Sequence, residues 1–196
     1  MTTLWPAAWR IANAGIPIRE TTISPGSVTT TPSVTRQRKT RRGGTLPLVR
    51  RLEVEGRRVL LCHGSPRKIN EFVWESASPD QFLEYLLDQA AADVVCVTHT
   101  GIKWHRRLPG DRHFVNVGVL GRPENDGNTN VWYTLLSFDA TDVRVEFVPV
   151  VYDFLSLASD MRSERLPDEF VETITTGWWT TCLEILPHKE RARGHY

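Results

Sequence analysis

The chain has 196 residues, of which 40% are hydrophobic, and a formal net charge of +1. This length and apolar content suit one globular domain, and the balanced charge argues against binding of nucleic acid or an anionic membrane through overall charge. No apolar run reaches the roughly 18–20 residues of a membrane span, and the N-terminal residues lack the pattern of a secretory signal. We therefore expect a cytoplasmic protein without a membrane or nucleic-acid partner.

Cysteine usage agrees with this expectation. Cys62, Cys96 and Cys182 are far apart and form no C-x-x-C pair, so neither a zinc knuckle nor a disulfide framework is indicated. Cys62 and Cys96 lie in apolar, strand-like runs, where cysteine behaves as a small hydrophobe. We interpret them as core residues in a reducing compartment.

Residues 1–43 differ in composition from the rest of the chain. Thr, Ser, Pro, Arg and Gly dominate from 20 to 44 without apolar periodicity, and such a segment buries too little surface to offset its ordering entropy. We expect 1–43 to be disordered. Its basic cluster is either a solvated tail, which we favour, or an arm that seeks phosphate; the cluster comprises Arg36, Arg38, Lys39, Arg41 and Arg42.

The pattern from 44 to 151 predicts a mixed α/β domain. Two strands are joined by a turn at Glu55–Gly56, and the second becomes continuously apolar, as a buried strand does. A helix begins at Pro79 with Ser78 as its N-cap, and a second buried strand follows at 94–97. The strand–helix–strand order predicts a parallel βαβ unit.

Shorter elements follow these. We expect β segments at 113–117, 131–138 and 143–151, and then helices at 153–165 and from Pro167 onward. Residues 152–196 are interpreted as a helical tail that packs on the domain, with Trp178 and Trp179 as its anchors.

Two histidines directly follow the two buried strands. His63 comes after the first of them and His99 after the second, with one threonine between strand and histidine. The carboxyl ends of parallel strands meet at one edge of a sheet, where loops carry functional groups. A neutral imidazole there is a good ligand for Zn, Mn, Fe or Ni, and Gly64 permits the sharp turn after His63. The pair fits a metal site and a structural role equally well, whereas either histidine alone would favour a structural or solvent-exposed role.

Three segments also carry a resemblance to a known family. LLCHGSP, VTHTGIKWHRR and HFVNVGVLGRPENDGNTNVWYTLL, in this order, resemble the last motifs of calcineurin-like metallophosphoesterases of the small bacterial and archaeal type. In that family an H-G pair follows one strand, G-H-T-H follows the next, and a V-N-x-G-S-x-G-x-P strand and turn comes after. The resemblance covers roughly 44 to 151. It implies a β-sandwich flanked by helices and metal-dependent hydrolysis of phosphate esters.

The resemblance assigns roles residue by residue. His63 matches the metal ligand of the H-G pair and His99 the first histidine of G-H-T-H, whose second histidine falls on Gly101 here. His105 is a candidate substitute for that lost ligand. A partial site for one divalent transition metal (Mn, Fe, Zn or Ni) is therefore implied. The residues expected to shape it are Gly64, Gly101, Asn116 and Gly118.

The chain departs from the family upstream of His63. The D-x-H, G-D and G-N-H-D/E motifs that begin the family domain do not precede it, so we expect a truncated domain that lacks the N-terminal βαβ units. Asp111-Arg112-His113 spells D-x-H, but it lies in a turn after the histidine motifs and is interpreted as turn chemistry. Loss of the first units would expose a sheet edge and an apolar face, which favours self-association.

The functional expectation follows from these departures. A complete family member would clamp a phosphate between two metals about 3.5–4 Å apart and activate water for attack. This chain offers only part of the ligand set and no identified catalytic residue. Four basic residues are expected in the loops after the two buried strands, where they are either phosphate contacts or ordinary surface charges: Arg67, Lys68, Arg106 and Arg107.

Three hypotheses remain open. The chain is a phosphoesterase whose site another chain or a dimer partner completes, or a non-catalytic remnant or binding protein with a partial metal site. In the third, the basic arm binds nucleic acid.

Overall fold

The computed structural model describes residues 37–39, 45–139 and 141–191. Most of the segment predicted to be disordered, 1–43, lies outside these residues. Its described part is strand β1 (Gln37–Lys39), which pairs antiparallel with β2 (Thr45–Pro47). No helix within the described ranges is long and apolar enough to span a membrane.

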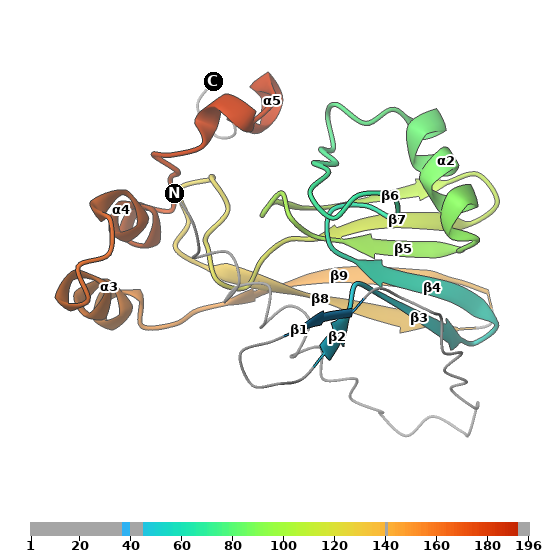
Figure 1. The fold of residues 1–196 in the computed structure, drawn as a ribbon, viewed down its shortest axis with the longest axis horizontal. Coiled ribbons are helices and arrows are strands. Elements are labelled where there is room, and N and C mark those ends of the chain that lie inside the picture. Colours follow the sequence, from blue (N-terminus) through green and yellow to red (C-terminus); the bar gives the residue numbers. More distant parts are fainter. Residues whose placement is uncertain (1–36, 40–44, 140, 192–196) are drawn as a thin grey trace.

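A five-stranded mixed sheet forms the centre of the domain, with the order β3-β4-β5-β7-β6 (Figure 1). The three inner strands are parallel, and each outer strand is antiparallel to its neighbour. The strands are β3 (Val49–Val54), β4 (Arg57–Cys62), β5 (Val94–Val97), β6 (Lys103–Leu108) and β7 (Arg112–Val117). This confirms the predicted hairpin, in which Glu55 and Gly56, both with positive φ, join β3 to β4.

The predicted βαβ unit is also confirmed. Helix α2 (Asp80–Ala90) connects β4 to β5, and all four residues of β5 are buried. The predicted cap is wrong: Pro79 occupies the N-cap position, without a side-chain cap bond. Ser78 instead accepts a hydrogen bond through its carbonyl from Arg106 Nη1 at 2.6 Å.

The domain has three layers, because both faces of the sheet are apolar. Helix α2 covers one face, where its leucines pack against Leu60 and Phe114. The hairpin of β8 (Val131–Phe138) and β9 (Val143–Val150) covers the other face, where it packs against Val59 and Val115. The expected fold class, a mixed α/β sandwich with flanking helices, is confirmed.

Side chains alternate between these two layers along the strands. Cys62 packs in the cluster on the α2 side and Cys96 in the cluster on the hairpin side. Burial raises the pKa of each thiol to about 12, so both stay protonated at neutral pH. Their predicted core placement is confirmed.

Strand β6 was missed from the sequence. The stretch was taken as a loop, but it pairs antiparallel with β7 along its whole length. Trp104 and Leu108 are its buried residues, and its remaining positions are polar or charged, as suits an edge strand. Arg106 and Arg107 therefore lie in a strand and not in the loops at the carboxyl ends of β4 and β5, where the sequence placed them.

The C-terminal part continues from β9. Helices α3 (Phe154–Ser163) and α4 (Asp168–Thr176) are followed by η1 (Leu183–Ile185) and α5 (His188–Arg191). Trp179 is 5% exposed and packs with Trp74, Ile102 and Leu186 in a third apolar cluster. The outer face of β8 leaves Tyr133 and Leu135 exposed, and self-association remains a prediction.

Candidate functional site

The register of β4 and β5 places His63 and His99 at one edge of the sheet. The two strands pair in parallel with Val59 beside Val94, so the same offset places His63 beside Thr98. His99 is one residue further along and has a φ of 90°, which is a left-handed backbone conformation. Such a backbone costs on the order of 1–3 kcal/mol and occurs often at functional sites.

That conformation accompanies a direct contact between the two rings. His63 Nε2 lies 2.9 Å from His99 Nδ1, and the ring planes meet at 75°. The predicted pair of imidazoles therefore shares one place at the carboxyl ends of β4 and β5.

The surroundings favour the neutral form of both imidazoles. Burial, and then the nearby His99, lower the pKa of His63 to about 4. Burial also lowers the pKa of His99. Phe72 packs against the His99 ring with a centroid distance of 4.3 Å and stacks on Trp74, which forms an apolar wall beside the pair. Neutral imidazoles are the form that binds metals.

The geometry of the pair fits two ligands of one metal. At metal–nitrogen distances of about 2.0–2.1 Å, two nitrogens at the right angle of octahedral coordination lie about 2.9 Å apart, and two at the tetrahedral angle about 3.3–3.4 Å apart. The separation of 2.9 Å between His63 Nε2 and His99 Nδ1 matches the octahedral spacing and equally allows one N–H···N hydrogen bond. Within the described part of the chain, no group of three or more His, Cys, Asp or Glu residues is placed to hold a metal ion.

Gly64 makes the turn after His63 possible. Its φ is 76°, and a Cβ at this position would lie 2.4 Å from the Lys68 carbonyl oxygen. That carbonyl accepts a hydrogen bond from Ser65 N at 2.9 Å, so it is fixed in place. Any side chain at 64 would displace this loop and His63 with it.

Asn116 and Gly118 connect the His99 loop to β7. Fully buried Asn116 donates through Nδ2 to Thr100 Oγ1 at 2.8 Å and accepts from Gly118 N at 3.1 Å. Thr98 Oγ1 donates to the Gly118 carbonyl at 2.6 Å. These bonds hold the backbone on both sides of His99.

Gly101 stands where the family motif has its second histidine. Its φ is 79°, and a Cβ there would lie 3.2 Å from Cη2 of Trp179. The Trp179 ring is held by a bond from its Nε1 to the Pro123 carbonyl at 2.7 Å. An indole thus fills the space beside Gly101.

The other predicted site residues lie elsewhere. Arg67 forms an ion pair with Glu71, in which its Nε donates to Oε2 at 2.9 Å. Arg106 donates to the carbonyls of Ser78 and Glu75 at 2.6 and 2.7 Å and to Asp80, next to the start of α2. Both guanidinium groups are therefore engaged in contacts within the protein.

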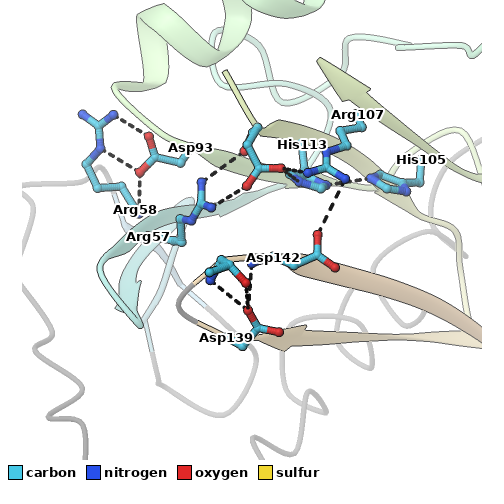
Figure 2. Close-up of polar contacts among 10 residues, drawn as sticks. Arg57, Arg58, Asp93, His105, Arg107, His113, Asp139 and Asp142 are labelled. Carbon is cyan, nitrogen blue, oxygen red and sulfur yellow. Dashed lines mark hydrogen bonds and ion pairs between the residues drawn. The ribbon is translucent and has the colours of Figure 1, made fainter. Parts of the chain in front are cut away.

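His105 is part of a second histidine pair near the amino end of β7. His105 Nε2 lies 2.9 Å from His113 Nδ1, and the rings stack with an interplanar angle of 5° (Figure 2). His113 Nε2 lies 3.3 Å from Asp111 Oδ1, and Asp111 also forms ion pairs with Arg57 and Arg107. The D-x-H sequence thus belongs to an ion-pair network at the other end of the parallel strands from His63.

Arg122 was not considered from the sequence, although it lies in the loop between β7 and β8. Its Cζ is 3.7 Å from the centroid of the Trp179 ring. Its Nε and Nη2 are buried and have no hydrogen-bond acceptor among the described residues. Each buried donor left in this way costs about 1–3 kcal/mol. Burial lowers the Arg122 pKa to about 10, so the group remains charged at neutral pH.

Comparison with known proteins gives relatives of low identity. No protein-family model matches the chain. An uncharacterized protein from Methanocaldococcus jannaschii is 24% identical over 147 residues, which are 68% of this chain and 57% of that protein. A hypothetical protein from Pyrococcus horikoshii has a similar solved structure, with a TM-score of 0.58 and 18% identity over 69% of this chain and 52% of that one.

A metallophosphoesterase from Sphaerobacter thermophilus also aligns, with a TM-score of 0.48 and 22% identity over 61% of this chain and 56% of that one. Of these two solved structures, that of the Pyrococcus horikoshii protein shows a likeness of fold to this chain. The chain spans only between half and three fifths of the length of these three proteins.

The turn at Gly64 gives a first prediction. Gly64→Ala should lower the free energy of unfolding by at least about 2 kcal/mol more than Gly56→Ala, because a methyl group at 64 meets backbone atoms. Gly56 is a matched control, since its φ is 73° and a Cβ there has nothing within 4 Å. Urea unfolding followed by tryptophan fluorescence measures both variants. Equal losses would contradict the packing described for the His63 turn.

The His113 network gives a second prediction. His113 is 1% exposed, and burial lowers its pKa against the opposing effect of Asp111. Around the ordinary histidine pKa of about 6.5, the unfolded chain binds a proton at this residue more readily than folded His113 does, so stability falls as pH falls. His113→Gln should therefore reduce the stability lost between pH 7.5 and 5.5.

Urea unfolding at several pH values measures this difference. The charged groups around His113 are Asp111, Arg107 and Asp142, and they are present in both proteins. The wild-type protein, measured at the same pH values, provides the reference slope. An unchanged slope in His113→Gln would contradict the assignment.

Proposed function

We propose that this chain carries part of a metal-dependent phosphoesterase centre, with His63 and His99 as two ligands of one divalent transition metal. The observation that carries the proposal is the 2.9 Å separation of His63 Nε2 and His99 Nδ1 at the carboxyl ends of adjacent parallel strands. Support comes from the order of the H-G, T-H-T-G and V-N-x-G segments, which resembles the later motifs of calcineurin-like phosphoesterases.

The residues of the chain would act mainly by positioning. A bound divalent metal supplies Lewis-acid polarisation of a phosphate oxygen and activation of water for attack on phosphorus. His63 and His99 would present neutral nitrogens, since burial keeps both pKa values below the ordinary range. Phe72 covers one side of His99 and excludes water from that side. Thr98 and Asn116 hold the loop that carries His99.

Hydrolysis requires ligands in addition to this pair. Two imidazoles bring no negative charge to offset a dication, and no third His, Cys, Asp or Glu of the described residues is placed to hold a metal ion with them. We propose that catalysis depends on carboxylates from outside the described residues, supplied by another chain or a second copy.

The three cysteines are free, which supports the proposed cytoplasmic setting.

A second candidate function is a non-catalytic protein that binds one metal or a phosphate group. It is favoured by Gly101, where the family has a histidine and where Trp179 fills the space. The Trp179 ring occupies the space that the side chain of a metal ligand at position 101 would need. This packing favours a binding role over a complete catalytic metal site.

Metal titration tests the proposal. Isothermal titration calorimetry with Mn, Co, Ni and Zn salts should detect one site per chain. His63→Ala and His99→Ala should each weaken binding at least tenfold, because each removes one ligand. His105→Ala should bind as the wild type does, since His105 contacts His113 and not the pair.

Hydrolysis of a chromogenic phosphodiester in the presence of the same metals separates the two candidates. Metal-stimulated turnover that His63→Ala abolishes supports the phosphoesterase. Metal binding without turnover excludes hydrolysis by this chain and its own copies, and leaves the binding protein or a phosphoesterase that another chain completes. If none of the four metals binds, or if His63→Ala binds as the wild type does, both metal-dependent proposals fail.

A further inference from the structure

The two donors of Arg122 without an acceptor belong to one edge of its guanidinium. Nε and Nη2 point in the same direction and together form the fork that grips two oxygens of a phosphate or carboxylate. Both atoms are buried, and neither has a hydrogen-bond acceptor among the residues that the structure describes. A buried charged fork without an acceptor is unusual, because such groups are normally paired.

The nearby acidic group does not serve this fork. Glu124, two residues further on, accepts hydrogen bonds from Lys103 N at 2.5 Å and from Lys103 Nζ at 2.6 Å. Within the described ranges Arg122 takes part in no ion pair, whereas Arg67 and Arg106 each have a carboxylate partner. The loop therefore contains a buried positive charge whose Nε and Nη2 donors are available to a ligand that accepts hydrogen bonds.

Trp179 links Arg122 to the histidine pair. One face of the indole lies against the guanidinium, with 3.7 Å from Cζ to the ring centroid. The six-membered end of the same ring is the nearest neighbour of Gly101, two residues after His99. The ring is fixed by bonds from its Nε1 to Pro123 O and from Trp179 N to Asn125 Oδ1 at 2.9 Å. Arg122 is therefore held one indole ring away from the His99 loop.

We propose that the Nε–Nη2 edge of Arg122 binds a phosphate oxyanion beside the His63–His99 pair. This inference rests on the proposed function for its ligand class, which is phosphate. It assigns to Arg122 the phosphate contact that the sequence analysis considered for Arg67 and Arg106. Stacking on Trp179 orients the guanidinium plane, so that the fork is already in place before the anion arrives.

The buried position of the fork has a consequence for access. Phosphate can reach Nε and Nη2 only when the segments that cover them move aside, because both atoms are screened from solvent. Binding then closes these segments around a paired ion. Hydrogen exchange of the amides in 119–130 should slow when phosphate is added.

The test uses inorganic phosphate and the full chain with chelator present, so that no metal contributes. Calorimetric titration with potassium phosphate, against potassium chloride of equal ionic strength, measures the affinity. Arg122→Gln and Arg122→Lys should each weaken phosphate binding at least tenfold, since neither keeps the two-donor fork. Exposed Arg144 on β9 gives the charge-matched control, and Arg144→Gln should stay within twofold of the wild type.

Circular dichroism and thermal unfolding without phosphate establish that each variant is folded, and Arg122→Lys serves if Arg122→Gln is not. Three results would overturn the inference: no phosphate binding by the wild type, equal binding by the Arg122 variants, or an equal loss in Arg144→Gln.

Cobalt titration of the same variants separates this inference from the proposed function. Intact cobalt binding with no role for Arg122 in phosphate binding removes the inference and leaves the metal site. Phosphate binding that depends on Arg122 in a chain that binds no cobalt leaves the anion site and removes the metal-dependent function.

Discussion

The parallel pairing of β4 with β5 is the constraint on which the site depends. Because Val59 pairs with Val94 and Leu61 with Cys96, strands β4 and β5 end side by side, and the residues that follow them lie close together. The left-handed conformation of His99 then brings its ring to within 2.9 Å of His63. A shift of one residue in this register would turn the side chains of one strand to the opposite face of the sheet and separate the imidazoles.

Residues of the C-terminal segment also pack against the loop that carries His99. Trp179 packs with Trp74 and Ile102, lies against Gly101, and carries Arg122 on its face. Glu190 in α5 accepts a hydrogen bond from Ser76 N at 2.9 Å, so the end of the described chain is also fastened to the loop before α2. In Figure 1, α5 lies away from the sheet, and the bond from Ser76 to Glu190 connects it to the loop between β4 and α2. The loop that carries His99 is thus supported by residues about eighty positions further along.

Much of the fold follows from local patterns in the sequence. The turn at Glu55–Gly56 predicts the β3–β4 hairpin, and the two continuously apolar strands with a helix between them predict the parallel pairing of β4 with β5. That pairing in turn predicts that His63 and His99 lie at one edge of the sheet. Strand β6 could not be predicted in this way, because only Trp104 and Leu108 are buried in an otherwise charged run. The N-cap was assigned to Ser78 on propensity, whereas the tertiary contact of its carbonyl with Arg106 decides the geometry there.

The rest of the candidate site depends on contacts between distant residues. His105 joins His113 because β6 and β7 pair with His105 opposite Val115, and no sequence spacing identifies this register. Arg67 and Arg106 look like free charges in the sequence, but Arg67 pairs with Glu71 four residues further on, and Arg106 is engaged by Asp80, which only folding brings near. Arg122 is the converse case, because nothing in its sequence context distinguishes it. Only the burial of its Nε and Nη2 atoms, and the absence of an acceptor for them among the described residues, identify it as a candidate anion contact.

The central claim is that His63 and His99 bind one metal together. Anomalous diffraction from crystals soaked in a cobalt salt tests it most directly, because the signal locates the ion without reference to activity. The account predicts one strong peak at about 2.0–2.2 Å from both His63 Nε2 and His99 Nδ1. A peak at another site, or no peak beside these two nitrogens in crystals that contain cobalt, would contradict it.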